Sequence, residues 1–427
     1  MKKRWVLLKR VNDYDPLLMR KVIDEGLELL GEKPKGRVLI KPNVVFAHKR
    51  YSRHAYTNPE LVGQMVDALR RSGVTELAIG ESGAFAVPTR MLFKQSGFYE
   101  MGKSRGIDIT DFNEDKYVKT TLSKAKFHKT MLVPRLISEA EFKIWMPKLK
   151  YHICCEITNS LKLNIGSLLH KERMLYHDDR LNEKIVDILE IGYPNLVVTD
   201  AVIIGHGFES CAKPFHLGLV MISNDPVASD VVAAQILNYR PHDVKHLKIA
   251  SERGYGDISP ESVEVLGDVS IEELAAQTKG IVSEFQDMSK VNSPIRFYEG
   301  IGPNTNEICY GGCMAAVKGC LGTIDASKPG SVRNAKKGAI VTGIYEGDVD
   351  AGNGTALLIG DCTEVKGNIR AGKVKKVKGC PIGAVQLTGV LPFTFDMPSP
   401  LFDPKDGLNF VVNSAEKFCH KIANRAF

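Results

Sequence analysis

The sequence predicts an α/β protein with a large three-layer domain on a mostly parallel sheet, followed by a smaller α/β domain. Two observations support this prediction. From the start of the chain to about residue 255, short apolar runs alternate with amphipathic helical patterns, which is typical of a parallel sheet covered by helices. A second group of apolar runs follows at residues 339–343 and 356–361, among turns rich in Gly and Lys.

The first domain begins with strands and a capped helix. Residues 5–8, 37–41 and 77–81 have the length of strands and are mostly apolar in their interior. Thr57-Asn58-Pro59-Glu60 lies between the last two and is a helix start, because a polar side chain caps the first turn and proline suits its beginning. Gly73 ends this helix. Residues 37–81 therefore predict a βαβ unit with a right-handed crossover.

The same pattern recurs farther along the chain. Residues 142–146, 196–200 and 219–222 are typical of further strands, and Asn224-Asp225-Pro226 marks another capped helix. Strands ending at Glu81 and Asp200, together with a loop at 146–152, place polar side chains at one edge of the sheet. Open parallel sheets bind their ligands at that edge.

These patterns divide the chain into four segments. Residues 1–255 form an α/β domain with a substrate crevice, and residues 256–295 are a polar connection with one helix. Residues 296–395 form a cysteine-rich domain, and residues 396–427 are a tail with a short helix after Asn413. We detect no internal repeat.

Composition narrows the class of protein. The chain has 427 residues, of which 44 % are hydrophobic and 25 % charged, with a formal net charge of +7. These values are typical of a globular protein, and the charge is too small for a dedicated nucleic-acid binder. No run approaches the ~20 apolar residues of a membrane span, and the first apolar run is too short for a signal peptide. We therefore expect a cytoplasmic protein without nucleic-acid or membrane partners.

Five of the nine cysteines lie between residues 309 and 380. An odd cysteine count in a chain without a secretory signal argues against a disulfide framework. Four of the five stand near Gly or Pro on predicted turns, where the backbone can approach an inorganic cluster closely. We expect one 4Fe–4S cluster, bound by Cys309, Cys313, Cys362 and Cys380. Cys320 instead falls on the apolar side of a predicted helix.

Other interpretations of these cysteines stay open. Structural zinc sites carry ligand pairs two to four residues apart, a spacing that only Cys309 and Cys313 satisfy. Free cysteines are also often buried as small hydrophobic residues. The spacing matches neither the bacterial nor the plant-type ferredoxin pattern, so it leaves open whether three or four cysteines bind a cluster.

A basic stretch lies between Cys362 and Cys380. Its members are Lys366, Arg370, Lys373, Lys375, Lys376 and Lys378. A solvated hairpin is one interpretation. The other is that these cations raise the potential of an anionic cluster or dock an acidic electron donor.

Basic and amide side chains also gather at the predicted ligand edge of the first domain. Lysine supplies a point charge for a carboxylate or phosphate, and histidine transfers protons near neutral pH. We expect His152, Lys150 and Lys162 to act on a small anionic substrate. The residues expected to bind it are Lys41, Asn43, Glu81, Asn164, His170 and His177. The last two are seven residues apart and share one face if the segment is helical.

Several short motifs together resemble a known family. They are Ile40-Lys41-Pro42-Asn43, Thr57-Asn58-Pro59, Gly80-Glu81-Ser82-Gly83, Leu149-Lys150-Tyr151-His152, residues 158–166, residues 171–177, Asp200, and Asn224-Asp225-Pro226-Val227 with Asp230. Over residues 36–240 the chain resembles the family catalogued as domain of unknown function 362. The resemblance implies an iron–sulfur protein, and many members carry a fused ferredoxin-type domain. The segment from Lys162 to Gly166 is also faintly similar to nickel-dependent lactate racemases, which implies a shared fold.

Three functions follow from these observations. We favour an oxygen-sensitive iron–sulfur oxidoreductase, in which the cluster adjoins the Lys/His crevice and a ferredoxin-type donor supplies electrons. The first alternative is a lyase or dehydratase that uses an open iron as a Lewis acid. The second is a non-catalytic electron carrier, although a carrier does not need a large α/β domain with a polar crevice. No Gly-x-Gly-x-x-Gly or Walker-type loop supports a nucleotide cofactor.

Overall fold

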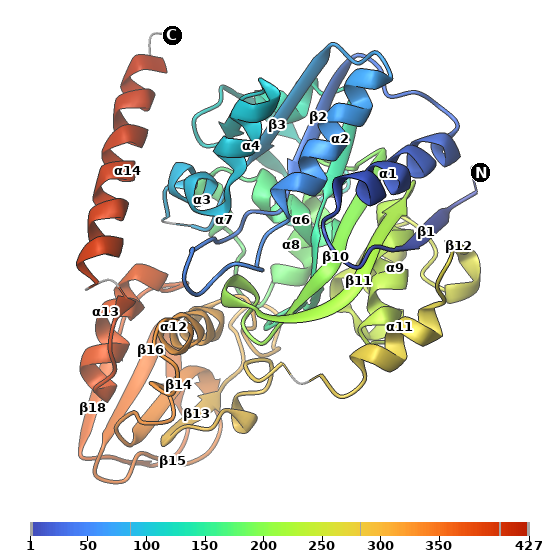
Figure 1. Ribbon diagram of the computed structural model, residues 1–427. Coiled ribbons are helices and arrows are strands. Elements are labelled where there is room, and N and C mark those ends of the chain that lie inside the picture. The colour runs from blue at the N-terminus through green and yellow to red at the C-terminus, as the bar shows by residue number, and fades with distance from the viewer. Residues whose placement is uncertain (1–2, 86, 282, 401–402, 425–427) are drawn as a thin grey trace. The chain divides into compact units, whose positions relative to one another are not determined.

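The computed structural model describes residues 3–85, 87–281, 283–400 and 403–424 (Figure 1). The chain forms two units, each with its own sheet. Unit 1 comprises residues 1–173, 183–282 and 413–427, and unit 2 comprises residues 174–182 and 283–412. Both units combine mostly parallel strands with helices, so the predicted fold class is confirmed.

A ten-stranded sheet forms the centre of unit 1. In spatial order its main path is β12 (Glu264–Gly267), β1 (Trp5–Arg10), β11 (Lys213–Ser223), β10 (Leu196–His206), β7 (Phe142–Met146), β2 (Arg37–Pro42), β3 (Glu76–Glu81) and β4 (Ile109–Asp111). Two further strands, β8 (Lys148–His152) and β9 (Glu156–Thr158), extend from β10. Pairing is parallel from β10 to β4, whereas β11 runs antiparallel to both of its neighbours.

Both faces of this sheet are buried, as the predicted three layers require. On β2, Val38 and Ile40 join one apolar core with α1 (Pro16–Leu30) and α2 (Pro59–Arg71), which lie on the same face in Figure 1. Leu39 joins a second core on the opposite face, with Trp145 and Leu163. Successive side chains of a strand point to opposite faces, so the apolar run 38–40 supplies both cores.

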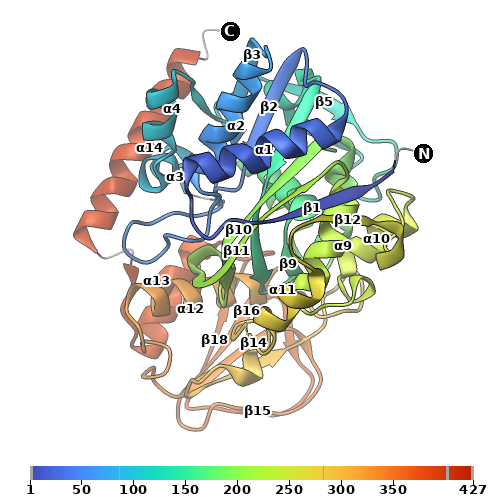
Figure 2. The same cartoon turned by 45° about the vertical axis from the view of Figure 1, so that its right-hand side comes forward.

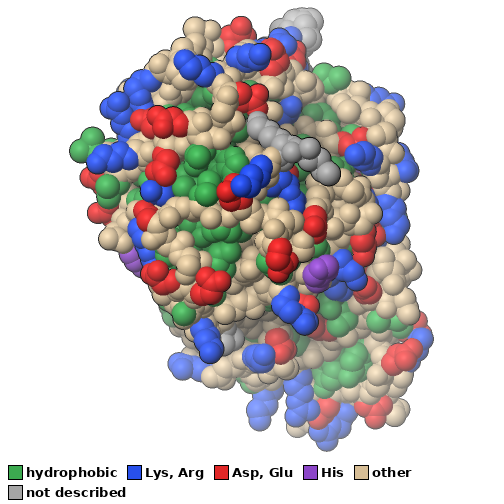
Figure 3. All heavy atoms as spheres, turned by 90° about the vertical axis from the view of Figure 1, so that its right-hand side faces the viewer, with side chains coloured by type: hydrophobic (Ala, Val, Ile, Leu, Met, Phe, Trp, Pro, Cys, Tyr) green, Lys and Arg blue, Asp and Glu red, His purple; other side chains and the backbone are tan. Residues whose placement is uncertain are grey.

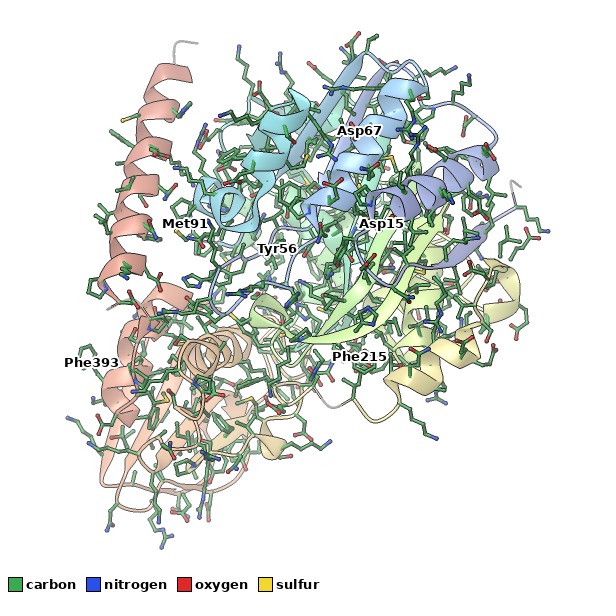
Figure 4. The ribbon with its side chains drawn as sticks, viewed as in Figure 1. Asp15, Tyr56, Asp67, Met91, Phe215 and Phe393 are labelled. Atoms are coloured by element: carbon green, nitrogen blue, oxygen red, sulfur yellow. The ribbon has the colours of Figure 1, made fainter. Side chains whose placement is uncertain are left out.

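Capping side chains fix where the main helices begin. Asp15, labelled in Figure 4, accepts hydrogen bonds from the backbone of Leu17 and Leu18 at the start of α1. Asn58 caps α2 in the same way, as predicted, and Asp225 caps the buried helix α9 (Pro226–Ile236), visible in Figure 2. The other helices and strands of unit 1 are α3 (Thr89–Ser96), α4 (Phe98–Arg105), β5 (Tyr117–Thr121), β6 (Thr130–Pro134), α5 (Arg135–Glu139), α6 (Ser160–Leu163), α7 (His170–Arg173), α8 (Leu181–Asp187, whose first two residues belong to unit 2), α10 (Lys245–Glu252) and α11 (Ile271–Thr278).

Two details of the predicted ligand edge are wrong. Asp200 does not end a strand, because β10 continues to His206 past an irregular step between Ala201 and Ile203. The expected loop at 146–152 contains strand β8, which pairs with β10 and β9. Lys148 and Lys150 break the apolar pattern that marks a buried strand, and their partners in the folded chain explain their burial.

The segment expected to be a connection contributes to the large sheet. Residues 264–267 form β12, which pairs in parallel with β1, and α11 follows it. Residues up to 282 belong to unit 1, and unit 2 resumes at Ser283. The strand pattern of β12 is short, and Glu264 and Gly267 interrupt its apolar character.

Unit 2 is built on a four-stranded parallel sheet. Its order is β13 (Ile295–Glu299), β14 (Gly338–Tyr345), β16 (Thr355–Val365) and β18 (Lys373–Val377). Two short strands, β15 (Val349–Asp350) and β17 (Ile369–Arg370), pair beside it. The helices are α12 (Cys313–Ser327), α13 (Ala384–Phe395) and α14 (Pro404–Asn424), whose last turns belong to unit 1. The tail helix therefore begins at Pro404, before the predicted start near Asn413.

A short internal repeat lies beside this sheet, contrary to the expectation that the chain has none. The segments 347–352 and 367–372 place Gly, Ala and Gly at equivalent positions, and β15 pairs with β17 in register. A Cβ on Gly367 would lie 2.3 Å from the carbonyl oxygen of Gly347, so this close approach requires glycine. β18 pairs in parallel with β16, so the interpretation of the basic stretch as a hairpin is wrong.

Charged and apolar side chains are mixed on the face drawn in Figure 3, with basic side chains gathered at its lower end. On α13, Phe393, labelled in Figure 4, is 79 % exposed. Within the described residues, no helix has both the length and the apolar character to cross a membrane.

Candidate functional site

In unit 1, buried charges gather at the carboxyl ends of β2 and β3. Lys41 is the last residue but one of β2, Glu81 ends β3, and their side chains form a fully buried ion pair. Gly166 packs against this pair, because a Cβ there would lie 2.5 Å from Glu81 Oε1 and 2.6 Å from Lys41 Nζ. Burial raises the pKa of Glu81, and the Lys41 ammonium opposes that shift. The pair brings two predicted site residues together and leaves neither charge uncompensated.

A second buried pair lies on β8 and β10. Lys148 Nζ lies 3.0 Å from Asp200 Oδ1, and the Tyr14 hydroxyl donates to the same oxygen at 2.9 Å. Asp200 Oδ2 accepts a hydrogen bond from the backbone of Asn58, the cap of α2. This carboxylate therefore ties β8 to the start of α2.

Lys150, predicted to act on substrate, is fully buried among oxygen acceptors. Its ammonium donates to the carbonyl oxygens of Ala55 at 2.7 Å and Glu209 at 3.2 Å, and to Asn43 Oδ1 at 3.2 Å. Three acceptors match the three donors of an ammonium group. Burial lowers the pKa of Lys150 to about 7.

Lys162 differs from these three lysines. It lies in the short helix α6, one residue before the end, and is partly exposed. Within the described part of the chain, no hydrogen bond or ion pair reaches its ammonium group. Burial raises the pKa of the nearby Glu209 carboxyl, and the Lys162 charge opposes that shift. Lys162 is therefore the crevice lysine whose donors are available to a ligand.

His152 is held on both sides of its ring. Its Nδ1 accepts a hydrogen bond from the Cys154 backbone at 3.0 Å, and its Nε2 lies 3.3 Å from Glu209 Oε1. This arrangement places the proton of the neutral ring on Nε2, directed at the carboxylate. Glu209 follows the turn after β10 and was not predicted, because no strand end or motif marks it in the sequence.

Unpaired hydroxyl groups lie in the same segment as Lys162. Thr158 Oγ1 and Ser160 Oγ are buried and have no hydrogen-bond partner among the described residues, and neither does Ser167 Oγ. Asp230 accepts hydrogen bonds from the backbone of Ser160 and Leu161, which fixes the start of α6. Buried polar groups normally have partners, so these hydroxyls are candidates for water or a ligand.

The remaining predicted residues of the crevice have other surroundings. Asn164 Oδ1 accepts a hydrogen bond from the Trp145 indole at 3.0 Å, and His170 Nε2 lies 3.2 Å from the carbonyl oxygen of Gly83. His177 belongs to unit 2, where its Nδ1 lies 2.6 Å from the Gly311 carbonyl oxygen. The suggestion that His170 and His177 share a helix face is wrong, because α7 ends at Arg173 and Tyr176 adopts a positive φ of 54°.

In unit 2, the four predicted cysteine ligands line one pocket, together with Asp178. Cys309 precedes α12 and Cys313 is its first residue. Cys362 lies on β16 where the register with β14 shifts, and Cys380 follows β18. These positions bring together thiols that lie far apart in the sequence of the unit. Asp178 was not predicted, because it stands in a segment far from the cysteines in sequence.

Glycines allow the backbone to approach the sulfurs. A Cβ on Gly312 would lie 2.4 Å from Cys309 Sγ, and one on Gly360, at a φ of +116°, would lie 2.9 Å from Cys313 Sγ. The Cys309 thiol has a backbone hydrogen bond with Cys313, and the Cys313 thiol has one with Ile382. Side chains at these glycines would occupy the space around the sulfurs.

Burial holds the thiols in their protonated form when no metal is bound. It raises the pKa of Cys309 to about 12 and that of Cys313 to about 11. A metal group must therefore displace these protons on binding. Cys320 lies on α12, buried beside Leu321 and Ile324, and does not line the pocket.

The donor set fits an iron–sulfur cluster in chemical terms. Four thiols face one pocket, and backbone hydrogen bonds reach two of the sulfurs. Among the described residues, no group of three or more His, Cys, Asp or Glu side chains is placed to hold a single metal ion.

Comparisons with known proteins bear on unit 1. The family model described as domain of unknown function (DUF362) matches residues 38–235, which confirms the predicted resemblance over that range. No curated protein sequence matches the chain.

Two solved structures are similar in part. The lactate racemase apoprotein from Thermoanaerobacterium thermosaccharolyticum aligns with a TM-score of 0.35 and 10 % identity, over 80 % of this chain and 70 % of that one. A structural-genomics crystal structure of a protein from Thermotoga maritima aligns with a TM-score of 0.37 and 13 % identity, over 77 % of this chain and 70 % of that one.

Proposed function

We propose that the protein is an iron–sulfur oxidoreductase that acts on a small carboxylate or phosphate, with one 4Fe–4S cluster bound in unit 2. The observation that carries the proposal is the convergence of Cys309, Cys313, Cys362 and Cys380 on one pocket. Such a cluster supplies a one-electron redox couple when bound. Backbone hydrogen bonds and glycines around the pocket would help the thiolates to bind this cluster.

In unit 2, the backbone stabilises ligation. Hydrogen bonds from the backbone to the Cys309 and Cys313 sulfurs favour the thiolate form against the opposing effect of burial. Gly312 and Gly360 keep the space around those sulfurs free of side chains. Cys320 has no role in this proposal.

In unit 1, we assign binding of the anion to Lys162 and the hydroxyls of Thr158 and Ser160. Lys162 offers an ammonium group without a protein partner among the described residues, and the two hydroxyls are buried and unpaired. Lys41, Lys148 and Lys150 already have oxygen partners, so their part is to fix the sheet edge. Asn43 holds Lys150 in place.

Proton transfer falls to His152 and Glu209, with Lys162 beside them. The Nε2 proton of His152 points at a carboxyl whose pKa is raised by burial, so a proton can be held between the two side chains and passed on to the substrate. Reduction of the substrate adds electrons from a ferredoxin-type donor, and each added electron is matched by one proton from this pair. The donor is oxidised and the substrate is reduced.

One observation favours a lyase as the second candidate. Cys380 is exposed, whereas Cys309 and Cys313 are buried. Ligation by the other three cysteines alone would leave one iron open to a substrate hydroxyl as a Lewis acid. Under that alternative, Cys380→Ser keeps the cluster, whereas loss of the cluster in this variant favours four-cysteine ligation.

The direct test is metal analysis and electron paramagnetic resonance of anaerobically purified protein, with and without dithionite. We expect about four iron and four sulfide per chain and a signal that changes on reduction. Stoichiometric zinc, or a sample with neither iron nor sulfide, would overturn the proposal.

A further inference from the structure

Strand β18 lies at the edge of the sheet of unit 2. It pairs with β16, and within the described residues no strand pairs with its other side. Residues 373–376 are exposed, and Val374 is 51 % exposed. An open edge offers unpaired backbone groups to another protein.

We name residues 366–378 the basic strand. This segment contains six Lys or Arg and no Asp or Glu. Lys366 pairs with Glu346 at 3.0 Å and Arg370 with Asp350 at 2.6 Å. Lys373, Lys375 and Lys378 are exposed and make no hydrogen bond or ion pair with any residue that the structure describes. Three cations on one short segment are thus left without an ion-pair partner among the described residues.

The basic strand leads directly to the accessible side of the cysteine pocket. Lys376 Nζ donates to the carbonyl oxygens of Thr363 at 2.9 Å and Asp361 at 3.2 Å, which flank Cys362 on β16. After the basic strand the chain continues through Gly379 to Cys380. Cys380 is exposed and Cys362 is partly exposed, whereas the other two cysteines are buried. Cys380, which follows the basic strand in the sequence, and Cys362, whose neighbours accept hydrogen bonds from Lys376, are therefore also the two most exposed of the four cysteines.

We propose that the basic strand is the docking surface for an acidic one-electron carrier protein, which passes an electron to the cluster through the side of Cys362 and Cys380. This inference rests on the proposed function, because it requires a cluster in the pocket. The step breaks no bond, since the reduced carrier loses one electron and the oxidised cluster gains it. Opposite charge steers such encounters and can raise association rates by about 10–1000-fold at low salt.

Lysines on an open edge have another use, which the test must separate. Natural sheets often place lysine on edge strands to prevent aggregation. In that role the lysines only have to repel the edge strand of another molecule. Their distance from the cysteines then has no effect. It affects solubility and leaves the rate of electron uptake unchanged.

The experiment uses the full chain with its cluster, under anaerobic conditions. The variant combines Lys373→Glu, Lys375→Glu and Lys378→Glu. The matched control carries Lys33→Glu, Lys35→Glu and Lys279→Glu, which are exposed lysines of unit 1 and change the net charge equally. Reduction is followed by loss of cluster absorbance after mixing with a reduced plant-type ferredoxin, and separately with excess dithionite.

We expect the basic-strand variant to accept electrons from ferredoxin at least ~10-fold more slowly than wild type at low salt, with the control near wild type. We also expect the wild-type rate to fall steeply as salt rises, because screening weakens the attraction. Full reduction by dithionite in all three proteins shows that each of them contains the cluster. If the wild-type protein contains no cluster, that result counts against the proposed function and not against the docking surface.

Equal ferredoxin rates for variant and control would overturn the docking surface. A wild-type rate that does not depend on salt would overturn it as well, and this measurement needs no variant. If the basic-strand variant aggregates, the wild-type salt dependence decides between docking and edge protection.

Discussion

The two units use lysine in opposite ways. Unit 1 buries Lys41, Lys148 and Lys150 completely and gives each of them oxygen partners. Unit 2 leaves Lys373 and Lys375 exposed on an edge strand without acidic partners among the described residues. A buried ammonium with partners holds structure together, whereas an exposed one is available to another molecule. The capacity of a site to bind an anion or a partner therefore depends on how many of its lysines have free donors. The total number of lysines near the site is a poorer guide.

The largest expected effect follows from breaking a buried pair. Lys41→Met leaves the Glu81 carboxylate buried without its cation, which should lower the free energy of unfolding by ~3–5 kcal/mol. The matched change in unit 2, Lys373→Met, should alter it by less than ~0.5 kcal/mol. Denaturant unfolding of both variants measures the difference. Similar losses for both would contradict the contrast between the units.

The next effect concerns the crevice lysine with free donors. Lys162→Met should weaken binding of a small anion such as inorganic phosphate by at least ~10-fold, because a charge-assisted hydrogen bond contributes about 1.5–3 kcal/mol. Isothermal titration calorimetry provides the measurement, with Lys162→Arg as the variant that keeps the charge. Unchanged binding in Lys162→Met would remove Lys162 from the site.

A smaller effect is expected in the pH dependence of stability. Burial lowers the pKa of Lys150 to about 7 in the folded protein, below the ~10.4 of an unfolded chain. Between these values the unfolded chain binds more protons, so Lys150 makes stability rise with pH, by up to about 1.4 kcal/mol per pH unit. Below pH ~7 both states are protonated and this contribution to the slope vanishes.

Unfolding curves of wild type and Lys150→Met between pH 7.5 and 9.5 check this assignment. We expect the variant to have the shallower slope, because it lacks the proton that wild type takes up on unfolding. Identical slopes would show that Lys150 stays charged when folded.

The smallest effect is predicted for Cys320. Cys320→Ala removes a buried sulfur from α12 and should cost about 1 kcal/mol of stability, as a small cavity does. It should leave the cluster absorbance unchanged, because Cys320 does not line the pocket. Loss of the absorbance would make Cys320 a ligand and Cys362 the doubtful one.

Local signals predicted much of the fold. Asn58-Pro59 and Asp225-Pro226 mark helix starts that the structure confirms, and the run 38–40 supplies both cores. Strand β8 was missed, because Lys148 and Lys150 look like surface residues until their partners are known. Those partners, Asp200 and the Ala55 carbonyl oxygen, come from distant parts of the chain.

The candidate sites, too, depend on contacts between distant parts of the chain that the sequence does not show. Neighbouring Gly and Pro residues indicated which four cysteines to choose as ligands. That these four thiols line one pocket depends on the register of β14 and β16, which the sequence does not show. Glu209 and Asp178 carry no local signal, since each reaches its site through a turn. Which lysines are free depends on tertiary contacts, and Lys162 could not be told from Lys150 in the sequence.

We propose above that unit 2 holds a 4Fe–4S cluster through Cys309, Cys313, Cys362 and Cys380. The most direct test is Mössbauer spectroscopy of iron-enriched, anaerobically prepared protein, comparing Cys362→Ala with Cys320→Ala. We expect a spectrum of about four iron atoms typical of a 4Fe–4S cluster in wild type and Cys320→Ala, and loss of that spectrum in Cys362→Ala. Wild-type protein without cluster iron, or an intact cluster in Cys362→Ala together with its loss in Cys320→Ala, would contradict it.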